Sequence, residues 1–406
     1  MTSLSGLLPD NDPVLGRLAP GVRIYCVGGA VRDWLFGQPD KDRDYVVVGA
    51  DVESMIRAGF QPVGKDFPVF LHPVSHAEYA LARTERKSGH GYKGFVFRAD
   101  PSVTLEEDLS RRDLTINAIA VDHTGQIIDP FGGVNDLRAG RLRHVGPAFA
   151  EDPLRLLRLA RFAARWPEFH IADETMTLCR SIVAAGEMQA LVAERVWQEI
   201  STGLMEQMPS RMIHVLVESG AWSRLCSPAD FAADMPQWLD EAARRGVMLE
   251  GRFGLMVLGS AGDAVVTPDM AQSQAKRFKA PRHCIELAIT LLLQSQNLAP
   301  LRASLAQPTP SGCSILLDWL MACDALRRPT RLAQILMCLA ITGRIRDDEH
   351  ADIMLLADVA ASPQAGQMAA AAAAHAQSRG EAVGPAARAA RLAALCGHPR
   401  LASAKL

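Results

Sequence analysis

The sequence predicts an α+β protein in which a head built on a small mixed sheet is followed by a long all-helical remainder. Short apolar runs of strand length recur as far as Asp129, with only brief helical segments between some of them. From Pro153 onward the apolar side chains recur at helical spacing, as Leu154, Leu157 and Phe162 do. Strand signals nearly vanish beyond this point, so the two parts of the chain differ in class.

The predicted strands all lie in the first third of the chain. The last two are joined by His-Thr-Gly, which is typical of a hairpin. Helices are expected between some of the strands, notably at 52–58 and 105–109. Residues before about Val22 contain several Gly and Pro and indicate an irregular leader. The strands are expected at 24–27, 45–48, 67–71, 79–83, 94–97, 118–122 and 126–129.

The remainder of the chain is predicted to form successive helices. Pro153 suits the first helical position, with Asp152 as the N-cap. The alanine-rich stretch 361–395 is either helical, because alanine is the best helix former, or a flexible surface segment, and we assign it no function. Further helices are expected at 173–183, 193–206, 210–218, 281–293, 314–327 and 330–341.

Length and composition limit the classes of function. At 406 residues the chain exceeds what one core normally covers, so two or more domains are expected. A net charge of −2 excludes a globally basic nucleic-acid coat but allows a local basic patch. The eight cysteines form no CxxC pair or zinc-spaced cluster, and no uncharged run reaches about 18 apolar residues. We therefore expect a soluble cytoplasmic protein without a membrane partner.

A glycine corner and two aspartates near the N-terminus predict chemistry on phosphates. An apolar run ends at Gly28 and Gly29, and a second β-type run begins with Asp42 and Asp44. Side chains alternate across a strand, so both carboxylates would project from one face, with Arg43 on the other, and could hold Mg²⁺. The glycines would let the backbone approach a triphosphate. Each feature alone is typical of an ordinary turn or strand, but together they indicate phosphoryl or nucleotidyl transfer.

Two basic segments follow, and each leaves two interpretations open. Residues 83–93 carry five charged side chains and two glycines, and form either a mobile basic loop that neutralises phosphate or an ordinary hairpin loop. Arg112 would pair with a triphosphate as a planar fork. A structural salt bridge from Arg111 or Arg112 to Asp113 fits the sequence equally well.

Arginines recur at every third residue of the helix expected after Pro153. Arg155, Arg158 and Arg161 would form a basic stripe opposite the leucines, with Asp152 at its N-terminal end. One interpretation is a capped amphipathic helix with a solvated face. In the other, Asp152 accepts from the exocyclic amine of cytosine or adenine while Arg155 donates to the neighbouring ring nitrogen. Uracil and guanine present the opposite pattern, so protein alone would select C and A.

Together these segments resemble the class II tRNA nucleotidyltransferases, specifically the bacterial CCA-adding enzymes. The matching stretches occur in the family's order from about Val22 to Ala172. They are Val27-Gly-Gly-Ala-Val-Arg-Asp33 with Asp42-Arg-Asp44, Val63-Gly-Lys-Asp-Phe-Pro-Val-Phe-Leu-His-Pro73, Tyr79-Ala-Leu-Ala-Arg-Thr-Glu-Arg-Lys-Ser-Gly89, Arg111-Arg-Asp-Leu-Thr-Ile-Asn-Ala118 and Glu151-Asp-Pro-Leu-Arg-Leu-Leu-Arg158 continuing to Arg161.

The resemblance implies a polymerase β-type nucleotidyltransferase head followed by a helical neck, body and tail. On this chain these would be 1–140 for the head, 141–225 for the neck, and 226–406 for the body and tail. Members of the family add C, C and A to the 3′ end of tRNA from CTP and ATP without a nucleic-acid template. In the family the segment matching 83–92 is a flexible loop involved in the switch from C to A.

The resemblance also implies the site residues. Asp42 and Asp44 would be catalytic and would hold Mg²⁺, while Asp152 and Arg155 would read the base. The other nucleotide-binding residues would be Gly28, Gly29, Arg32, Arg112, Arg158 and Arg161.

Two features place the chain within this family. Bacterial poly(A) polymerases share the head but tend to carry an arginine-rich run where this chain has 64–68, so the CCA-adding branch is favoured. Multifunctional CCA enzymes carry an HD phosphohydrolase domain, whose His-Asp pairs bind a divalent metal. This chain has Gly259 and Ser260 where the pattern would place His-Asp, and His283 has no adjacent aspartate, so phosphohydrolase activity is not expected.

Two hypotheses from other classes remain open. A catalytically silent tRNA-binding protein would keep the fold, but intact Asp42 and Asp44 argue against it. A nucleotidyltransferase for small molecules would not need the long helical remainder and would transfer to an acceptor other than RNA.

Overall fold

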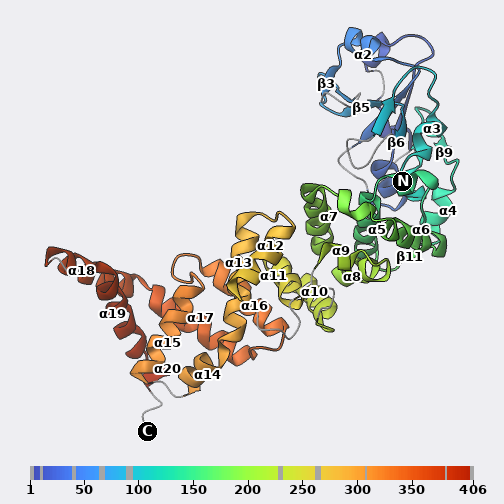
Figure 1. The fold of residues 1–406 in the computed structure, drawn as a ribbon. Helices are drawn as coiled ribbons and strands as arrows, with labels where there is room; N and C mark the ends of the chain where they lie inside the picture. The colour runs from blue at the N-terminus through green and yellow to red at the C-terminus, as the bar shows by residue number, and fades with distance from the viewer. Residues whose placement is uncertain are drawn as a thin grey trace. The chain divides into compact units, whose positions relative to one another are not determined.

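The chain forms two compact units in the computed structural model (Figure 1). The first comprises residues 1–199 and 214–224, and the second comprises residues 200–213 and 225–406. The boundary passes through α7 (Ala193–Met205) and α8 (Pro209–Glu218). The residues described by the structure are 4–9, 12–38, 43–63, 69–87, 95–226, 232–260, 267–306, 309–379 and 382–402.

A mixed sheet, seven-stranded over the described residues, organises the first unit. Its strand order is β3-β4-β5-β2-β1-β8-β9. The β2–β5 pair is parallel and the other neighbouring pairs are antiparallel. This register places Asp44 of β2 beside Val27 of β1 and beside Glu78 of β5. The strands are β1 (Arg23–Val27), β2 (Asp44–Val48), β3 (Gln61–Val63), β4 (Val69–Leu71), β5 (Glu78–Leu81), β8 (Ala120–Val121) and β9 (Ile127–Ile128).

The central strands bury alternate side chains on opposite faces of the sheet, as the period of two predicts. Cys26 and Val47 belong to a core cluster that also includes side chains from α1 (Gly29–Leu35) and α2 (Val52–Ala58). Val27 and Val46 belong to a second cluster with Leu109 of α3 (Leu105–Ser110). Both faces of the sheet are therefore covered by packed side chains. This packing holds in place the adjacent ends of β1 and β2, where Val27 lies beside Asp44.

The N-terminal segment is more ordered than the sequence predicts. Leu7, Leu8 and Val14 are buried in the first core cluster, and short 3-10 helices form at Leu4–Leu7 and Leu15–Arg17. The prediction of an irregular leader is therefore wrong for these residues. Their apolar side chains have no partners nearby in the sequence, so only the folded sheet explains their burial.

The predicted α+β class and the β8–β9 hairpin are confirmed. A separate antiparallel ribbon pairs β6 (Thr84–Lys87) with β7 (Phe95–Arg98). The first part of segment 83–93 is therefore strand rather than loop, and residues 88–94 lie outside the described residues. A short parallel pair, β10 (Arg141–Leu142) and β11 (His170–Ile171), is too brief for a sequence pattern to reveal.

The other helices of the first unit, among them α5 (Leu154–Arg165), follow β9 in the chain. The predicted N-cap is wrong by one residue: α5 begins at Leu154 with Pro153 at the N-cap position, although Asp152 Oδ1 still accepts from the Leu154 N–H at 3.0 Å. Phe162 of α5 stacks on Trp166 with ring centroids 5.2 Å apart. The helices not yet named are α4 (Gly133–Arg138), α6 (Asp173–Ala184) and α9 (Trp222–Leu225).

The described part of the second unit consists of helices and their connections. They are α10 (Met235–Arg244), α11 (Leu249–Ser260), α12 (Pro268–Arg277), α13 (Arg282–Gln296), α14 (Leu298–Ala306), α15 (Pro310–Ala322), α16 (Pro329–Ile341), α17 (Asp347–Ala361), α18 (Pro363–Ser378), α19 (Val383–Cys396) and α20 (Pro399–Ala402). None of the helices described has the length and apolar character needed to cross a membrane.

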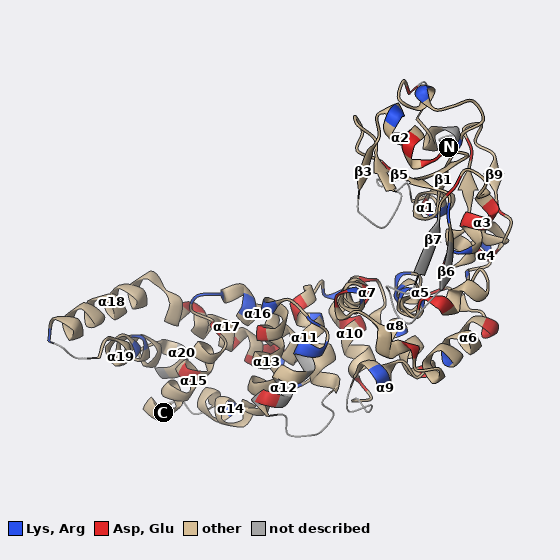
Figure 2. Cartoon of the chain, turned by 45° about the horizontal axis from the view of Figure 1, so that its top comes forward, with Lys and Arg blue, Asp and Glu red and all other residues tan. Residues whose placement is uncertain are grey.

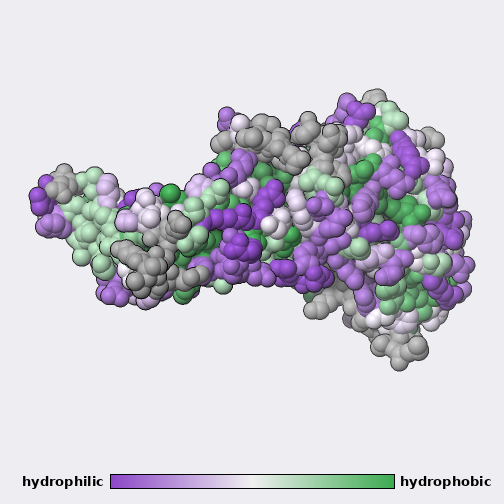
Figure 3. All heavy atoms as spheres, turned by 90° about the horizontal axis from the view of Figure 1, so that it is seen from below, coloured by the Kyte–Doolittle hydropathy of each residue, from purple (hydrophilic) through white to green (hydrophobic). Residues whose placement is uncertain are grey.

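The alanine-rich stretch forms two helices that pack together, α18 and α19. The helical alternative is thus confirmed over its described residues. α18 contains no Asp, Glu, Lys or Arg, and it is drawn entirely in tan in Figure 2. The part of the surface formed by these two helices is largely pale green in Figure 3, as expected for alanine.

Candidate active site

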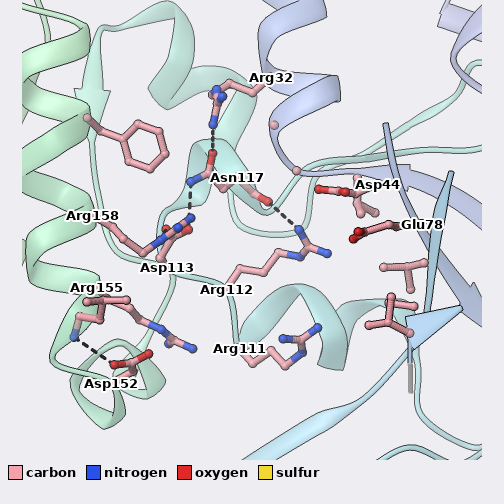
Figure 4. A pocket seen from close by; sticks show the side chains of 18 of the residues that line it. Arg32, Asp44, Glu78, Arg111, Arg112, Asp113, Asn117, Asp152, Arg155 and Arg158 are labelled. Carbon is pink, nitrogen blue, oxygen red and sulfur yellow. Dashed lines mark hydrogen bonds and ion pairs between the residues drawn. The ribbon is translucent and has the colours of Figure 1, made fainter. Parts of the chain in front are cut away.

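A pocket of about 650 Å³ opens beside the β1–α1 corner in the first unit (Figure 4). Its walls come from β1, α1, β2, β5, the segment 111–117, α5 and the start of α7. Arginines outnumber carboxylates around it, so the pocket attracts anions. Among the described residues the lining arginines are Arg32, Arg83, Arg111, Arg112, Arg155, Arg158, Arg161, Arg165 and Arg195, and the lining carboxylates are Asp44, Glu78, Asp113 and Asp152.

The structure brings the predicted site residues together, with one exception. Asp42 lies outside the described residues, so its pairing with Asp44 stays a prediction. The residues that line the pocket are Gly28, Gly29, Arg32, Asp44, Arg112, Asp152, Arg155, Arg158 and Arg161.

The glycine corner fits closely against Arg112. Gly28 has φ 71° and ψ −129°, a backbone conformation that is strongly unfavourable for residues other than glycine. A Cβ atom at this position would lie 2.8 Å from Nη1 of Arg112. The Gly28 N–H donates to the Ile119 carbonyl at 3.2 Å, which fixes the corner to the sheet. Gly28 is therefore required both for its backbone angles and for the close approach of the guanidinium.

Two carboxylates face the pocket from neighbouring strands. Asp44 and Glu78 open β2 and β5, which are parallel and in register at these residues, and Figure 4 shows their side chains next to each other. Arg43 instead donates through Nη1 to the Gly6 carbonyl at 2.8 Å. Carboxylate oxygens are the donors that Mg²⁺ prefers. Within the part of the chain that the structure describes, no three His, Cys, Asp or Glu side chains gather as metal ligands.

A buried carboxylate holds the two arginines at the back of the pocket. Asp108 accepts from Arg111 Nη2 at 2.6 Å and from Arg112 Nη2 at 3.3 Å. Burial by itself would raise the pKa of Asp108, but Arg111 and Arg112 outweigh burial and lower it. The alternative of a salt bridge from Arg111 or Arg112 to Asp113 is therefore wrong, because both arginines pair with Asp108.

Asp113 instead joins α5 to α1 through an amide. It accepts from Arg158 Nε at 2.7 Å and from Asn117 Nδ2 at 2.9 Å, while Asn117 Oδ1 accepts from Arg32 Nη1. Burial would raise the pKa of Asp113, but Arg158 and Asn117 lower it well below its ordinary range. The Arg32 guanidinium lies over the Trp166 ring at 4.9 Å from its centroid. Arg32 and Arg158 are therefore held in fixed positions.

Two of the predicted arginines of α5, Arg155 and Arg161, are largely buried. Arg155 is 9% exposed and donates through Nη1 to the Ala148 carbonyl at 2.7 Å. The side chain of Arg161 is 14% exposed and donates to Glu199 at 2.6 Å. The interpretation of a solvated basic face is therefore wrong for Arg155 and Arg161, although the helix is amphipathic and the Arg158 side chain is 36% exposed.

Sequence reasoning missed several residues of the site. Glu78 opens a strand just as Asp44 does, and this repeated pattern was the available signal. Asn117 lies within the predicted segment 111–118, but nothing local indicates that it bridges two charged groups. Arg195 and Glu199 of α7 lie 30 and 34 residues beyond Arg165, the last residue of α5, and only the folded chain brings them to it.

Comparison with known proteins relates the chain to one family. The family model described as the poly A polymerase head domain matches residues 24–143. A CCA-adding enzyme of Bordetella bronchiseptica is 51% identical, and the alignment covers 80% of this chain and 85% of the relative. A multifunctional CCA protein of Methylobacillus flagellatus is 49% identical, with 80% and 84% covered.

Solved structures share the fold. The Bacillus stearothermophilus CCA-adding enzyme in complex with CTP matches with a TM-score of 0.68 at 24% identity, over 97% of this chain and 92% of that chain. A Thermotoga maritima CCA-adding enzyme complexed with tRNA matches with a TM-score of 0.61 at 19% identity, over 89% and 86%. At these identities the structures show the fold alone. The curated relatives, about half identical over four fifths of this chain, show the family: the chain belongs to the bacterial CCA-adding enzymes, a branch of the class II tRNA nucleotidyltransferases.

Proposed function

We propose that this chain adds and repairs the 3′-terminal CCA of tRNA, using CTP and ATP and releasing pyrophosphate. The observation that carries the proposal is the Asp44–Glu78 carboxylate pair facing an arginine-lined pocket in a member of this family. Solved CCA-adding enzymes hold CTP, ATP or tRNA, which supports these substrates for this chain. In this chain the reaction needs no nucleic-acid template.

The triphosphate binds between the glycine corner and α5 in this proposal. Gly28 and Gly29 let the backbone approach the phosphates, while Arg112, Arg158 and Arg161 neutralise their charge. Arg32 completes the set from α1. This assignment is supported by the anchoring of each guanidinium to a carboxylate or amide, which holds it in place before the ligand arrives.

Mg²⁺ is the proposed metal, held by Asp42 and Asp44, and Glu78 lies beside Asp44. Bound there, it would lower the pKa of the tRNA 3′-hydroxyl and offset charge on the phosphates. The chain's own residues align the hydroxyl and the α-phosphate for in-line attack, and the arginines balance the charge of the departing pyrophosphate. No covalent enzyme intermediate is required.

Asp152 and Arg155 select the base in this proposal. The Asp152 carboxylate accepts from the exocyclic amine of cytosine or adenine, and Arg155 donates to the adjacent ring nitrogen. Both side chains line the pocket at the N-terminal end of α5. Uracil and guanine would leave these groups unpaired, so they are rejected.

The proposal also includes the division of the chain and its location. Residues 1–140 form the head, 141–225 the neck, and 226–406 the body and tail that bind tRNA. A reducing, cytoplasmic location is supported by the eight cysteines, which are all free thiols. Poly(A) synthesis is the second candidate activity, since the family model that matches 24–143 is named for that enzyme.

The test is incorporation of labelled CTP and ATP into tRNAs that end before, within and just short of CCA. We expect C, C and A to be added in order and the reaction to stop. Asp44→Asn should abolish transfer while tRNA affinity stays largely intact, because the variant keeps the shape of the side chain but loses its charge. Continued addition of A would indicate a poly(A) polymerase, and full activity of Asp44→Asn would remove that residue from the metal site.

A further inference from the structure

One face of α7 contacts pocket-lining side chains at two places along α5. Arg195 and Glu199 lie four residues apart in this helix, so they share a face. Arg195 contacts Asp152, at the start of α5, whereas Glu199 contacts Arg158 and Arg161, further along it. The charges are complementary at both places: a cation meets the carboxylate and a carboxylate meets the two cations.

The Asp152 carboxylate is fixed by two donors. Its Oδ1 accepts from the Leu154 N–H at 3.0 Å, and its Oδ2 accepts from Arg195 Nη2 at 3.0 Å. An ionised carboxylate has about four acceptor positions, so each oxygen keeps acceptor capacity for another donor. With both oxygens held, the carboxylate cannot rotate freely. The direction of its remaining lone pairs is therefore set before a base enters the pocket.

Glu199 acts on a different part of the site. It is 6% exposed and accepts from Arg161 Nε at 2.6 Å, and its other oxygen lies 3.6 Å from Nη1 of Arg158. Both arginines line the pocket. Glu199 thus holds the two arginines that are proposed to bind the triphosphate, whereas Arg195 holds Asp152.

We propose that Arg195 determines base selectivity by positioning Asp152, and that Glu199, one helical turn later, positions the arginines that bind the triphosphate. The inference rests on the proposed function, and specifically on Asp152 as the residue that reads the base. Arg195 is a positioning residue, because it acts through Asp152 rather than on the base. The two side chains of α7 therefore divide base selection from phosphate binding.

The first experiment compares Arg195→Ala with wild type in single-nucleotide addition to tRNA. kcat/KM is measured separately for CTP, ATP, UTP and GTP. The charged hydrogen bond from Arg195 fixes the Asp152 carboxylate, so without it the carboxylate can rotate and its oxygens no longer point in one direction. We therefore expect selectivity for CTP over UTP to fall about tenfold. Arg195→Lys retains a cation but not the fork, and should restore part of the selectivity.

Arg180→Ala is the matched control. Arg180 forms an ion pair with Glu218 in the same unit at 2.7 Å, but both side chains are more than half exposed and neither lines the pocket. Its selectivity should equal that of wild type. Thermal unfolding of all variants separates loss of selectivity from loss of folded protein.

Glu199→Gln tests the second half of the proposal. It should raise KM for CTP and UTP by the same factor and leave the CTP-to-UTP ratio unchanged, because the triphosphate is common to both. A fall in kcat/KM for all four nucleotides with Arg195→Ala, at an unchanged ratio, would overturn the proposal and make Arg195 a phosphate ligand.

The assay distinguishes this proposal from those on which it rests. A wild-type chain that incorporates neither CTP nor ATP would refute the proposed function. Asp152→Ala with unchanged selectivity would refute base reading by that residue. Relaxed selectivity in Asp152→Ala together with wild-type selectivity in Arg195→Ala would overturn the positioning role alone.

Discussion

Arg112 lines the pocket with one N–H donor unsatisfied among the described residues. Its Nε is buried and, among the described residues, has no hydrogen-bond partner, although Nη1 and Nη2 contact the Asn117 carbonyl and Asp108. A buried donor without a partner costs about 1–3 kcal/mol. A phosphate oxygen in the pocket would remove this cost, which accords with the proposed role of Arg112 in binding the triphosphate.

Replacing Gly28 with alanine should therefore disturb nucleotide binding more than folding. The added methyl would meet Nη1 of Arg112 at 2.8 Å, and the backbone has φ 71°. We expect kcat/KM for CTP to fall by about tenfold or more, since small displacements of positioning groups are costly. Gly37→Ala is the control, because Gly37 has φ 76° but open space around its position. Equal losses in the two variants would show that backbone strain alone matters.

Glu78→Gln tests the residue that sequence reasoning missed. Its neighbour in register is Asp44, so the loss of one negative charge should weaken metal binding. We expect a lower kcat and a higher Mg²⁺ concentration for half-maximal activity, measured by titrating Mg²⁺ in the CTP incorporation assay. An unchanged Mg²⁺ requirement would place Glu78 outside the metal site.

Much of the site could be predicted from residue types at fixed spacing. Gly28, Asp44 and Arg112 belong to short local patterns whose chemistry can be read without a fold, whereas Arg32 was assigned only through the resemblance to the family. Glu78 could not be assigned in the same way, because its role depends on parallel pairing of two strands that are separated by residues 49–77. Local patterns identify donors and acceptors, but not the partners that only tertiary register supplies.

At the scale of elements, Asp113 joins the segment 111–117 to α5. Because its folded-state pKa is depressed, the ionised form stabilises the fold above the unfolded-state pKa of about 3.9. That stabilisation is lost as the pH falls from there toward the folded-state pKa. Asp113 therefore links these two elements at neutral pH and releases them in acid.

Asp113→Asn should lower the free energy of unfolding at pH 7 by about 2 kcal/mol, since it leaves the Arg158 pair without its acceptor charge. The difference from wild type should be constant down to about pH 5 and shrink below about pH 4. Urea unfolding at a series of pH values measures this. Glu218→Gln, in an exposed ion pair, is the control and should show little difference at any of these pH values. A constant difference for Asp113→Asn into acid would contradict the assignment.

The elements themselves were predicted where periodicity is strong. α2 has the predicted bounds, because Asp51 and Ser54 form a capping box and Gly59 ends the helix in the left-handed conformation. β3 was missed, since its three residues, Gln61–Val63, are all exposed and include a proline. Short strands form because they pair with a neighbouring strand, and their own residue pattern contributes little.

At the scale of the whole molecule, the sequence predicted the succession of a sheet-based part and a helical part. It did not predict that the boundary of the compact units falls within α7 and α8. The three-part division into 1–140, 141–225 and 226–406 stays a prediction. Helical periodicity identifies a buried face but not which neighbour covers it, so the packing of successive helices is not encoded locally.

Packing around α11 argues against an HD-type metal centre in the second unit. At Gly259 a Cβ would lie 2.3 Å from Cγ of Met235, and Ser260 donates to the Met256 carbonyl at 2.7 Å. His283 lies 3.6 Å from Glu250 and has an exposed side chain. A larger side chain at Gly259 would therefore collide with Met235, and the Ser260 hydroxyl is already bonded within its own helix.

We predict that the full chain hydrolyses no 2′,3′-cyclic phosphodiester when Ni²⁺ or Mg²⁺ is added, because Gly259 and Ser260 offer no histidine or paired carboxylate to a metal. The assay uses a 2′,3′-cyclic nucleotide with an HD-domain phosphodiesterase as positive control. Restoring the signature should fail too: Gly259→His would collide with Met235 and lower the unfolding free energy by about 1–3 kcal/mol. Gly366→Ala in α18, which has open space, should instead be neutral or stabilising. Clear metal-dependent hydrolysis by the wild-type chain would refute this account of the second unit.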